Sequence, residues 1–101
     1  MTADLSSLTA ASFRDALGDG WQAVTASGER VSLALLVAEE TGGAPHLPGG
    51  RLPFRLLFEG PVGAALLQGV HLLQRNGWGE AEVFLVPLQP APNPQFEAIF
   101  G

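Results

Sequence analysis

The sequence has no cysteine, no lysine and no tyrosine, and only 15% of its 101 residues are charged. Without cysteine the chain cannot form a disulfide scaffold, a thiolate zinc site or a cysteine nucleophile. The low charge, set against 47% apolar residues, argues against intrinsic disorder, because the chain has enough apolar surface for a core. We therefore expect one small globular domain spanning residues 1–101.

Positively charged residues are fewer than negatively charged ones. Five arginines face ten acids, for a net charge of −5, so the chain cannot neutralise a run of phosphates and nucleic acid is not an expected partner. No apolar run approaches the roughly 20 residues of a membrane span. The first residues include Asp4 and no apolar stretch follows, so we expect no secretory signal and synthesis in the cytoplasm. Leaderless export or assembly into an extracellular structure stays open, and the final compartment is unknown.

Residues 8–17 have the pattern of a short helix. Thr9 is placed to cap its N-terminus and Gly18 to end it. The predicted buried face consists of Phe13, Ala16 and Leu17. Such a helix is too short to be stable alone, so it must dock on the rest of the domain.

From residue 21 onward, apolar residues recur with a period of two, which indicates β-strands. The predicted strands are residues 21–25, 30–39, 54–59, 70–75, 80–88 and 96–100. Turns at 26–29 and 76–79 join neighbouring strands, and residues 62–69 form an irregular connection. Residues 41–53, with four glycines and three prolines, form the longest loop. The expected fold is mainly β, a small antiparallel barrel or sandwich of about six strands with one short N-terminal helix.

The alternation also predicts which side chains face the core. In the strand of residues 30–39, we expect one face to carry Val31, Leu33, Leu35 and Val37, and the other to carry Ser32, Ala34 and Ala38. The predicted core consists of Val31, Leu33, Leu35, Phe54, Leu56, Phe58, Val83, Leu85 and Phe96.

Residues that could perform chemistry are few and scattered. His46 and His71 are separated by 25 positions and neither belongs to a metal-binding pair, so we interpret both as histidines at the solvent edge. The pairs Glu39–Glu40 and Glu80–Glu82 fit the solvated side of a sheet better than a catalytic cleft. No serine lies in a nucleophile elbow, and no phosphate-binding loop is present. We expect no metal, no cofactor and no catalysis.

The chain has more apolar residues than one small barrel can hide. In the strand of residues 80–88 the alternation fails after Val83, because large side chains would face both sides of the sheet. The run Leu35-Leu36-Val37 does the same in the strand of residues 30–39. A strand that is apolar on both faces is either covered on its outer side by the helix and loops or forms an exposed binding surface.

These observations leave two hypotheses for function. The first is a non-enzymatic structural or protein-interaction module with candidate protein-contact residues Trp78, Phe84, Leu36, Leu66 and Leu67. Trp78 lies in a hairpin turn, where it either folds back on its own barrel or anchors another chain. The second is a module that binds a small apolar ligand or a sugar in the barrel mouth, under the loop of residues 41–53.

Several short segments resemble a family of short bacterial proteins that is described only as a domain of unknown function. The matching segments are Leu8-Thr9-x-x-x-Phe13, the strand of residues 31–39, Phe54-x-Leu56-Leu57-Phe58-x-Gly60-Pro61, Leu67-Gln68-Gly69, Glu82-x-Phe84-Leu85-Val86-Pro87 and Phe96-Glu97-Ala98-Ile99-Phe100. One departure is Gly69-Val70-His71, which stands where the family is expected to have Gly-Thr-Tyr.

The resemblance implies a small β-rich domain and supplies no catalytic residue. Genes of this family often lie beside genes for proteins with phage-tail-collar domains, including microcystin-dependent proteins. That neighbourhood implies a subunit or accessory of a fibre-like or tail-derived assembly. Its partner would be another protein or a second copy of the chain.

Overall fold

Two strands near the middle and end of the chain show the expected alternation most clearly. The computed structural model describes residues 8–42, 52–88 and 92–100. In β3 (Phe54–Glu59) and β6 (Gln95–Phe100), every second side chain is buried. The two strands pair antiparallel along their whole length, from Phe54 opposite Phe100 to Glu59 opposite Gln95. Side chains from successive positions therefore point alternately into the core and toward solvent.

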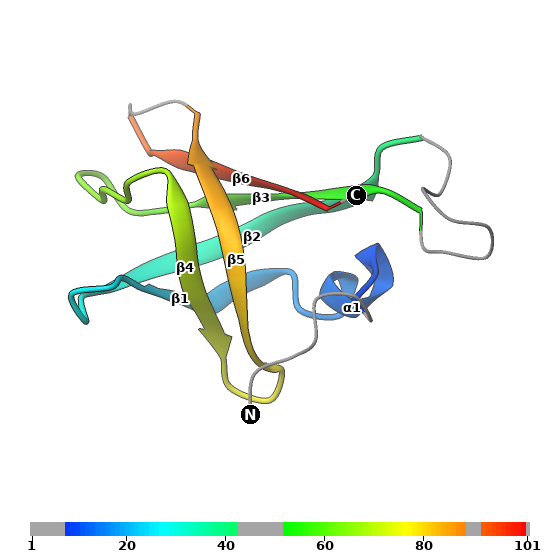
Figure 1. The fold of residues 1–101 in the computed structure, drawn as a ribbon, viewed down its shortest axis with the longest axis horizontal. Coiled ribbons are helices and arrows are strands. Elements are labelled where there is room, and N and C mark those ends of the chain that lie inside the picture. The colour runs from blue at the N-terminus through cyan, green and yellow to red at the C-terminus, as the bar shows by residue number, and fades with distance from the viewer. Residues whose placement is uncertain (1–7, 43–51, 89–91, 101) are drawn as a thin grey trace.

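The strands close into a six-stranded barrel (Figure 1). The remaining elements are α1 (Ala10–Arg14), β1 (Gly18–Val24), β2 (Arg30–Glu40), β4 (Gly69–Arg75) and β5 (Gly79–Pro87). Around the barrel the order is β1-β2-β3-β6-β5-β4, and all neighbours are antiparallel. The predicted mainly β fold, with about six antiparallel strands and one short helix, is confirmed.

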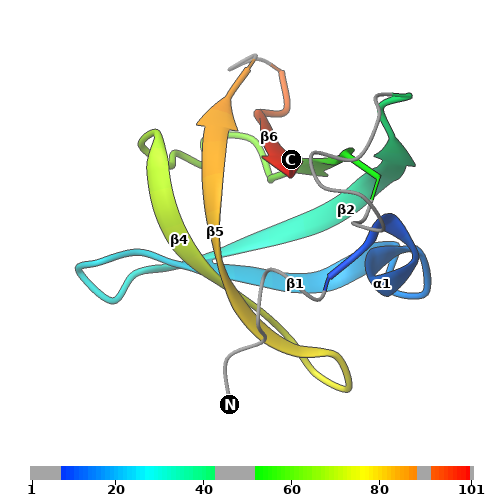
Figure 2. The same ribbon diagram turned by 45° about the vertical axis from the view of Figure 1, so that its right-hand side comes forward.

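Antiparallel pairing places successive turns at opposite ends of the barrel. At one end, which we call the helix end, lie α1, the β4–β5 turn and the end of β6 (Figures 1 and 2). The β1–β2 turn, the loop of residues 60–68, the end of β5 and the start of β6 lie at the other end. We call this the far end.

A β-bulge in β2 changes which side chains in the second half of the strand face the core, so the prediction for that half is wrong. Leu35 is paired with Phe58 but Val37 with Leu57, so the register shifts at Leu36. The extra residue reverses the alternation, and Ala38 faces the core where Val37 was expected. The apolar run of residues 35–37 therefore marks a bulge that leaves the Leu36 side chain 43% exposed.

The helix is shorter than predicted. Thr9 is its N-cap, as expected, and its backbone N–H donates to the Ser12 hydroxyl at 2.9 Å. The helix ends after Arg14, and the chain leads into β1 through Gly18, whose φ of +99° favours glycine. Leu17, expected on the buried face, is consequently exposed. In the described ranges 8–42, 52–88 and 92–100, no helix is long and apolar enough to cross a membrane.

The core at the helix end is a cluster of aromatic rings around Phe13. The Phe13 ring lies 5.0–6.0 Å, centroid to centroid, from the rings of Trp21, Phe54, Trp78 and Phe100. The contacted rings come from β1, β3, the β4–β5 turn and β6. This matters because β5 and β6 are paired at only two positions, near the far end. Phe13 fills the space between the strands where that pairing stops.

The predicted core is largely confirmed. Of its members, all except Val31 are buried, and Val31 packs against the buried cluster while partly exposed. Rings and aliphatic side chains therefore fill the barrel interior. The largest fully buried side chains are Trp21, Phe13, Phe54, Phe58, Phe96, Leu35, Leu56, Leu73 and Leu85.

The bulge in β2 makes opposite predictions for two adjacent leucines. Leu35→Ala removes a buried side chain and should lower the free energy of unfolding by about 2–5 kcal/mol. Leu36→Ala alters a side chain at the surface and should change it by about 0.5 kcal/mol or less. Urea denaturation of both variants measures the difference. Equal losses for the two variants would contradict the bulge.

Candidate functional site

A cleft opens at the far end of the barrel, between the loop of residues 60–68 and the adjoining ends of β5 and β6. Its volume is about 370 Å³. The lining consists of Ala64, Ala65, Leu66, Leu67, Pro87, Leu88, Pro94, Gln95 and Phe96. Apart from Gln95 these residues are apolar, and none has a side chain that titrates. The cleft is therefore suited to bind an apolar group, and the described residues of its lining offer no side chain for acid–base chemistry.

Backbone packing fixes the loop that forms one wall of the cleft. The Gly60 N–H donates to the Pro94 carbonyl at 2.9 Å, and a Cβ atom at Gly60 would lie 3.0 Å from the Ala64 Cβ. The Ala64 N–H in turn donates to the Pro61 carbonyl at 2.9 Å. Glycine at position 60 thus allows the loop to fold tightly against β6, and Leu66 becomes buried.

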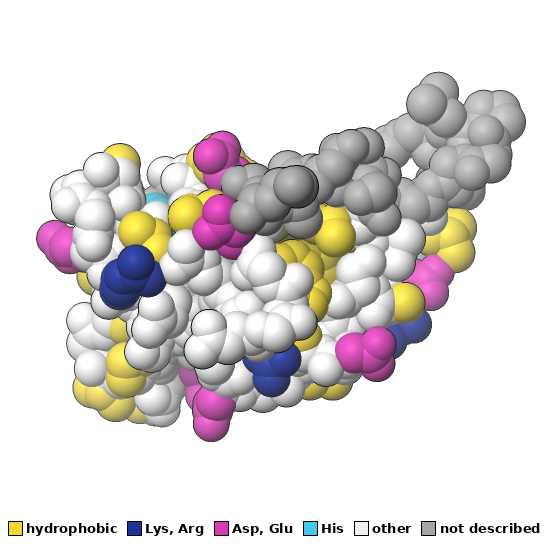
Figure 3. All heavy atoms as spheres, turned by 90° about the horizontal axis from the view of Figure 1, so that it is seen from below, with side chains coloured by type: hydrophobic (Ala, Val, Ile, Leu, Met, Phe, Trp, Pro, Cys, Tyr) yellow, Lys and Arg dark blue, Asp and Glu magenta, His cyan; other side chains and the backbone are white. Residues whose placement is uncertain are grey.

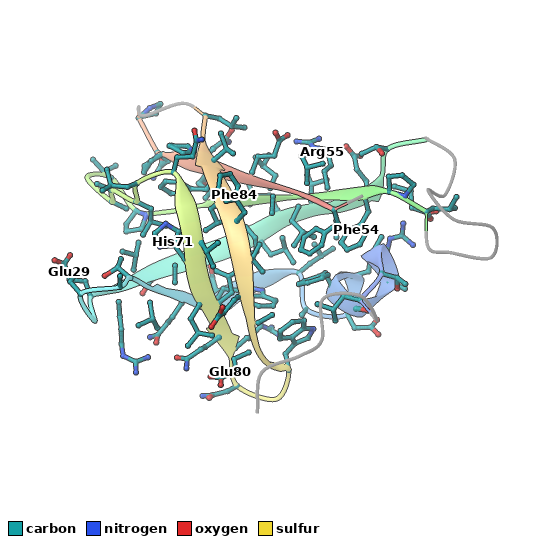
Figure 4. All side chains as sticks on the ribbon, viewed as in Figure 1. Glu29, Phe54, Arg55, His71, Glu80 and Phe84 are labelled. Atoms are coloured by element: carbon teal, nitrogen blue, oxygen red, sulfur yellow. The ribbon has the colours of Figure 1, made fainter. Side chains whose placement is uncertain are left out.

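His71 lies inside the barrel, so its predicted position at the solvent edge is wrong (Figure 4). It is paired with Val83, and both side chains face inward because the two strands alternate in step. Its Nε2 lies 2.7 Å from the Leu67 carbonyl oxygen. Since a carbonyl only accepts, Nε2 carries the proton in this bond. The histidine thereby ties the loop to β4, while its buried Nδ1 has no hydrogen-bond partner in the described part of the chain.

Large apolar side chains surround the cleft on the outside. Leu67 is 85% exposed and Leu88 48%, and both stand at the rim of the cleft. Val70 and Phe84 lie opposite each other on β4 and β5, and they are 59% and 51% exposed. Phe84 is labelled on the ribbon of β5 in Figure 4. We call the cleft together with Leu67, Val70, Phe84 and Leu88 the apolar end surface.

The shortest ion pairs between described residues lie on the outer wall of the barrel rather than in the cleft. The Arg55 guanidinium contacts Glu39 at 2.6 Å and Glu97 at 3.2 Å. The hydrogen bond to Glu39, followed by the negative charge of both carboxylates, raises the pKa of Arg55. Arg55 thereby links β2, β3 and β6 across the sheet. Glu39, the first residue of the pair Glu39–Glu40, takes part in this contact between strands.

The remaining carboxylates are also spread over the surface. Glu40 lies 3.4 Å from Arg14, and Glu80 accepts a hydrogen bond from Gln74 at 2.8 Å. Glu82 is exposed and makes no ion pair or hydrogen bond with a described residue. Within the described ranges, no three His, Cys, Asp or Glu side chains are grouped so that they could hold a metal ion. On the face shown in Figure 3 the arginines lie singly and form no basic patch.

A family model matches residues 8–100, which is nearly the whole chain. The chain belongs to the DUF6916 family, a domain of unknown function. The resemblance to such a family is thus confirmed for the domain itself. No curated protein matches the chain, and no solved structure matches it.

The structure of this family member separates the five candidate contact residues. Phe84 and Leu67 lie together on the apolar end surface. Leu66 lines the cleft but is only 5% exposed, so the expectation that Leu66 is an exposed loop residue is wrong. Leu36 is exposed at the bulge of β2, away from the cleft lining. Whether any of them contacts a partner stays a prediction.

Trp78 takes the first of its two predicted alternatives and folds back on its own barrel. Its ring centroid lies 4.9 Å from that of Trp21 and 5.0 Å from that of Phe13. Its indole N–H donates to the Ser12 carbonyl at 2.8 Å, and the Trp21 indole does the same to Ala16. Ser12 is one of the last four residues of α1, whose carbonyls lack helical partners, and Ala16 follows the end of the helix. Trp78 therefore packs on its own barrel while staying partly exposed, and its predicted contact with a partner is not tested.

Sequence reasoning missed Val70 and Leu88 as parts of the surface. The sequence could have predicted the place of Val70. A tight turn at residues 76–78 fixes the β4–β5 register, and this register pairs Val70 with Phe84. The sequence pattern could not predict the cleft, because three segments that are separate in the sequence form it. Most of the loop of residues 41–53, including His46, lies outside the described residues, and the proposed ligand site beneath it lies there too.

The position of Trp78 predicts a loss of stability when its hydrogen bond is removed. Trp78→Phe keeps an aromatic ring but leaves the Ser12 carbonyl without this donor, so the free energy of unfolding should fall by about 1–2 kcal/mol. Phe84→Leu, which alters an exposed ring, serves as the control and should have little effect. Urea denaturation measures both. Unchanged stability of Trp78→Phe would show that the bond contributes nothing.

Proposed function

We propose that the protein is a non-enzymatic structural or protein-interaction module, a subunit or accessory of a tail-collar or fibre-like protein assembly. The observation that supports this most strongly is the apolar end surface. There, large apolar side chains stand exposed around a cleft although the barrel interior is already filled. Such patches on small proteins mark sites of association.

The distribution of apolar residues explains why the surface lies at the far end. At the helix end, Phe13 and Trp78 cover the strand ends and bury the aromatic rings. Within the described chain, no comparable element covers Val70 and Phe84 on the outer side of β4 and β5. The helix therefore covers apolar side chains at the helix end only, and a partner protein would cover Val70 and Phe84 at the far end.

The link to a tail-collar or fibre-like assembly rests on the resemblance of the chain and on the gene neighbourhood that it implies. A small barrel whose described cleft residues are almost all apolar suits a role as a part of such an assembly. The partner would be the product of a neighbouring gene or further copies of this chain.

A second candidate function is the binding of a small apolar ligand in the cleft. The volume of about 370 Å³ lies within the range of ligand sites. A sugar fits less well, because among the described residues of the lining only Gln95 has a polar side chain, and its amide already donates to Glu59 at 3.4 Å. Saturable stabilisation of a monomer by an apolar ligand would favour this second function.

Sedimentation velocity tests the proposed function. The pure protein should give a species heavier than the monomer in at least one of two samples, alone or mixed with the product of its neighbouring gene. Phe84→Ser should reduce that species by removing exposed apolar area, and the reduction should be about fivefold or more. Leu17→Ser is the control, since Leu17 is similarly exposed but lies at the helix end. A strict monomer in both samples contradicts the proposal.

A further inference from the structure

The apolar end surface is continuous from the outer wall of the barrel into the cleft. Val70 is paired with Phe84, and Gly69 with Leu85. Leu67 lies two residues before β4 begins, Pro87 ends β5, and both line the cleft. The exposed pair and the cleft are thus neighbouring parts of one surface rather than two separate patches.

We propose that this surface docks a segment of another protein, which inserts one large apolar side chain into the cleft and places a lysine or arginine beside Glu82. The inference rests on the proposed function, and it names the surface and the kind of partner. The partner segment is recognised by an apolar anchor with positive charge next to it.

The exposed rim favours a protein over a small molecule. A ligand that fills the cleft would leave Val70 and Phe84 in water, since neither residue lines it. A protein segment can fill the cleft and also cover the side chains around it. An anchor in a pocket surrounded by contacts that exclude water is the usual arrangement of a protein interface.

The charges around the surface favour a basic partner. Glu82 stands two residues from Phe84 on the outer face of β5, exposed and without an ion pair in the described part of the chain. The four arginines in the described ranges are already engaged: Arg14 with Glu40, Arg55 with Glu39 and Glu97, Arg30 with Gln22 and Gln74, and Arg75 with the Asp19 carbonyl.

A second copy of the chain is therefore a poor fit for this face. Each chain has a net charge of −5, so a copy would bring a further excess of acids, and its described arginines would be engaged in the same way. A partner with its own lysine or arginine would pair with Glu82 and gain from the negative charge of the barrel.

Site-specific photo-crosslinking in the native cell tests the inference. The photoreactive residue p-benzoylphenylalanine replaces Phe84 or Leu67 on the surface, or Leu17 at the helix end as the control. Crosslinked product from positions 84 and 67 should exceed that from position 17 by about fivefold or more, as expected for a contact worth about 1 kcal/mol. Mass spectrometry should place the crosslink in a partner segment with a large apolar residue within about three positions of a lysine or arginine.

Two further variants, read through the crosslink at position 67, test the cleft and the charge separately. Ala65→Glu places a charge on an exposed wall of the cleft, and Glu82→Arg reverses the charge beside Phe84. Each should lower the crosslink yield about fivefold or more. Ala11→Glu and Asp15→Arg make the same changes at exposed positions of the helix end and should leave the yield unchanged. Circular dichroism confirms that each variant is folded.

Several outcomes would overturn the inference. Crosslinks to a second copy, or to an acidic or purely polar segment, contradict the stated partner. Equal yields from positions 84, 67 and 17, or unchanged yields in Ala65→Glu and Glu82→Arg, contradict the surface. If sedimentation shows a complex while positions 84 and 67 give no crosslink, the proposed function stands and this surface is wrong. If neither experiment shows a partner, both fail.

Discussion

The packing of Phe13 against four other rings is the contact on which the barrel most depends. A helix of five residues has no stability of its own, so α1 exists because Phe13 is buried among β1, β3, β6 and the β4–β5 turn. The indoles of Trp21 and Trp78 then donate to backbone carbonyls of the same segment. The Phe13 ring and the indole hydrogen bonds of Trp21 and Trp78 thus hold the helical segment against the barrel at the end where β5 and β6 are not paired.

This closure bears on where we propose that the protein interacts with others. The aromatic rings at the helix end pack against one another, whereas Leu67, Val70, Phe84 and Leu88 stay exposed on the apolar end surface. There the loop of residues 60–68 is held by Gly60 and by the hydrogen bond from His71 to Leu67. A fixed wall lowers the entropy that a partner must lose on binding, which suits an interaction surface better than a mobile loop would.

Some of the site was predictable from the sequence, and the misses have physical causes. Phe84 and Leu67 were found because each breaks a local rule, as an apolar residue on an outer strand face or in a loop. His71 was misplaced because its polarity suggested solvent, whereas strand alternation puts it opposite Val83 in the interior. Val37 was misplaced because one inserted residue in β2 reverses every side chain after it.

The sequence by itself determined the strands, the position of the N-cap and most of the core. These follow from local periodicity and capping, which depend on residues within a few positions of one another. The tertiary structure alone decided the closure of the barrel, the bulge at Leu36 and the cleft. Each depends on the register between segments far apart in the chain, such as Gly60 against Pro94. Local pattern does not encode that register, because it is set by how whole strands pack against one another.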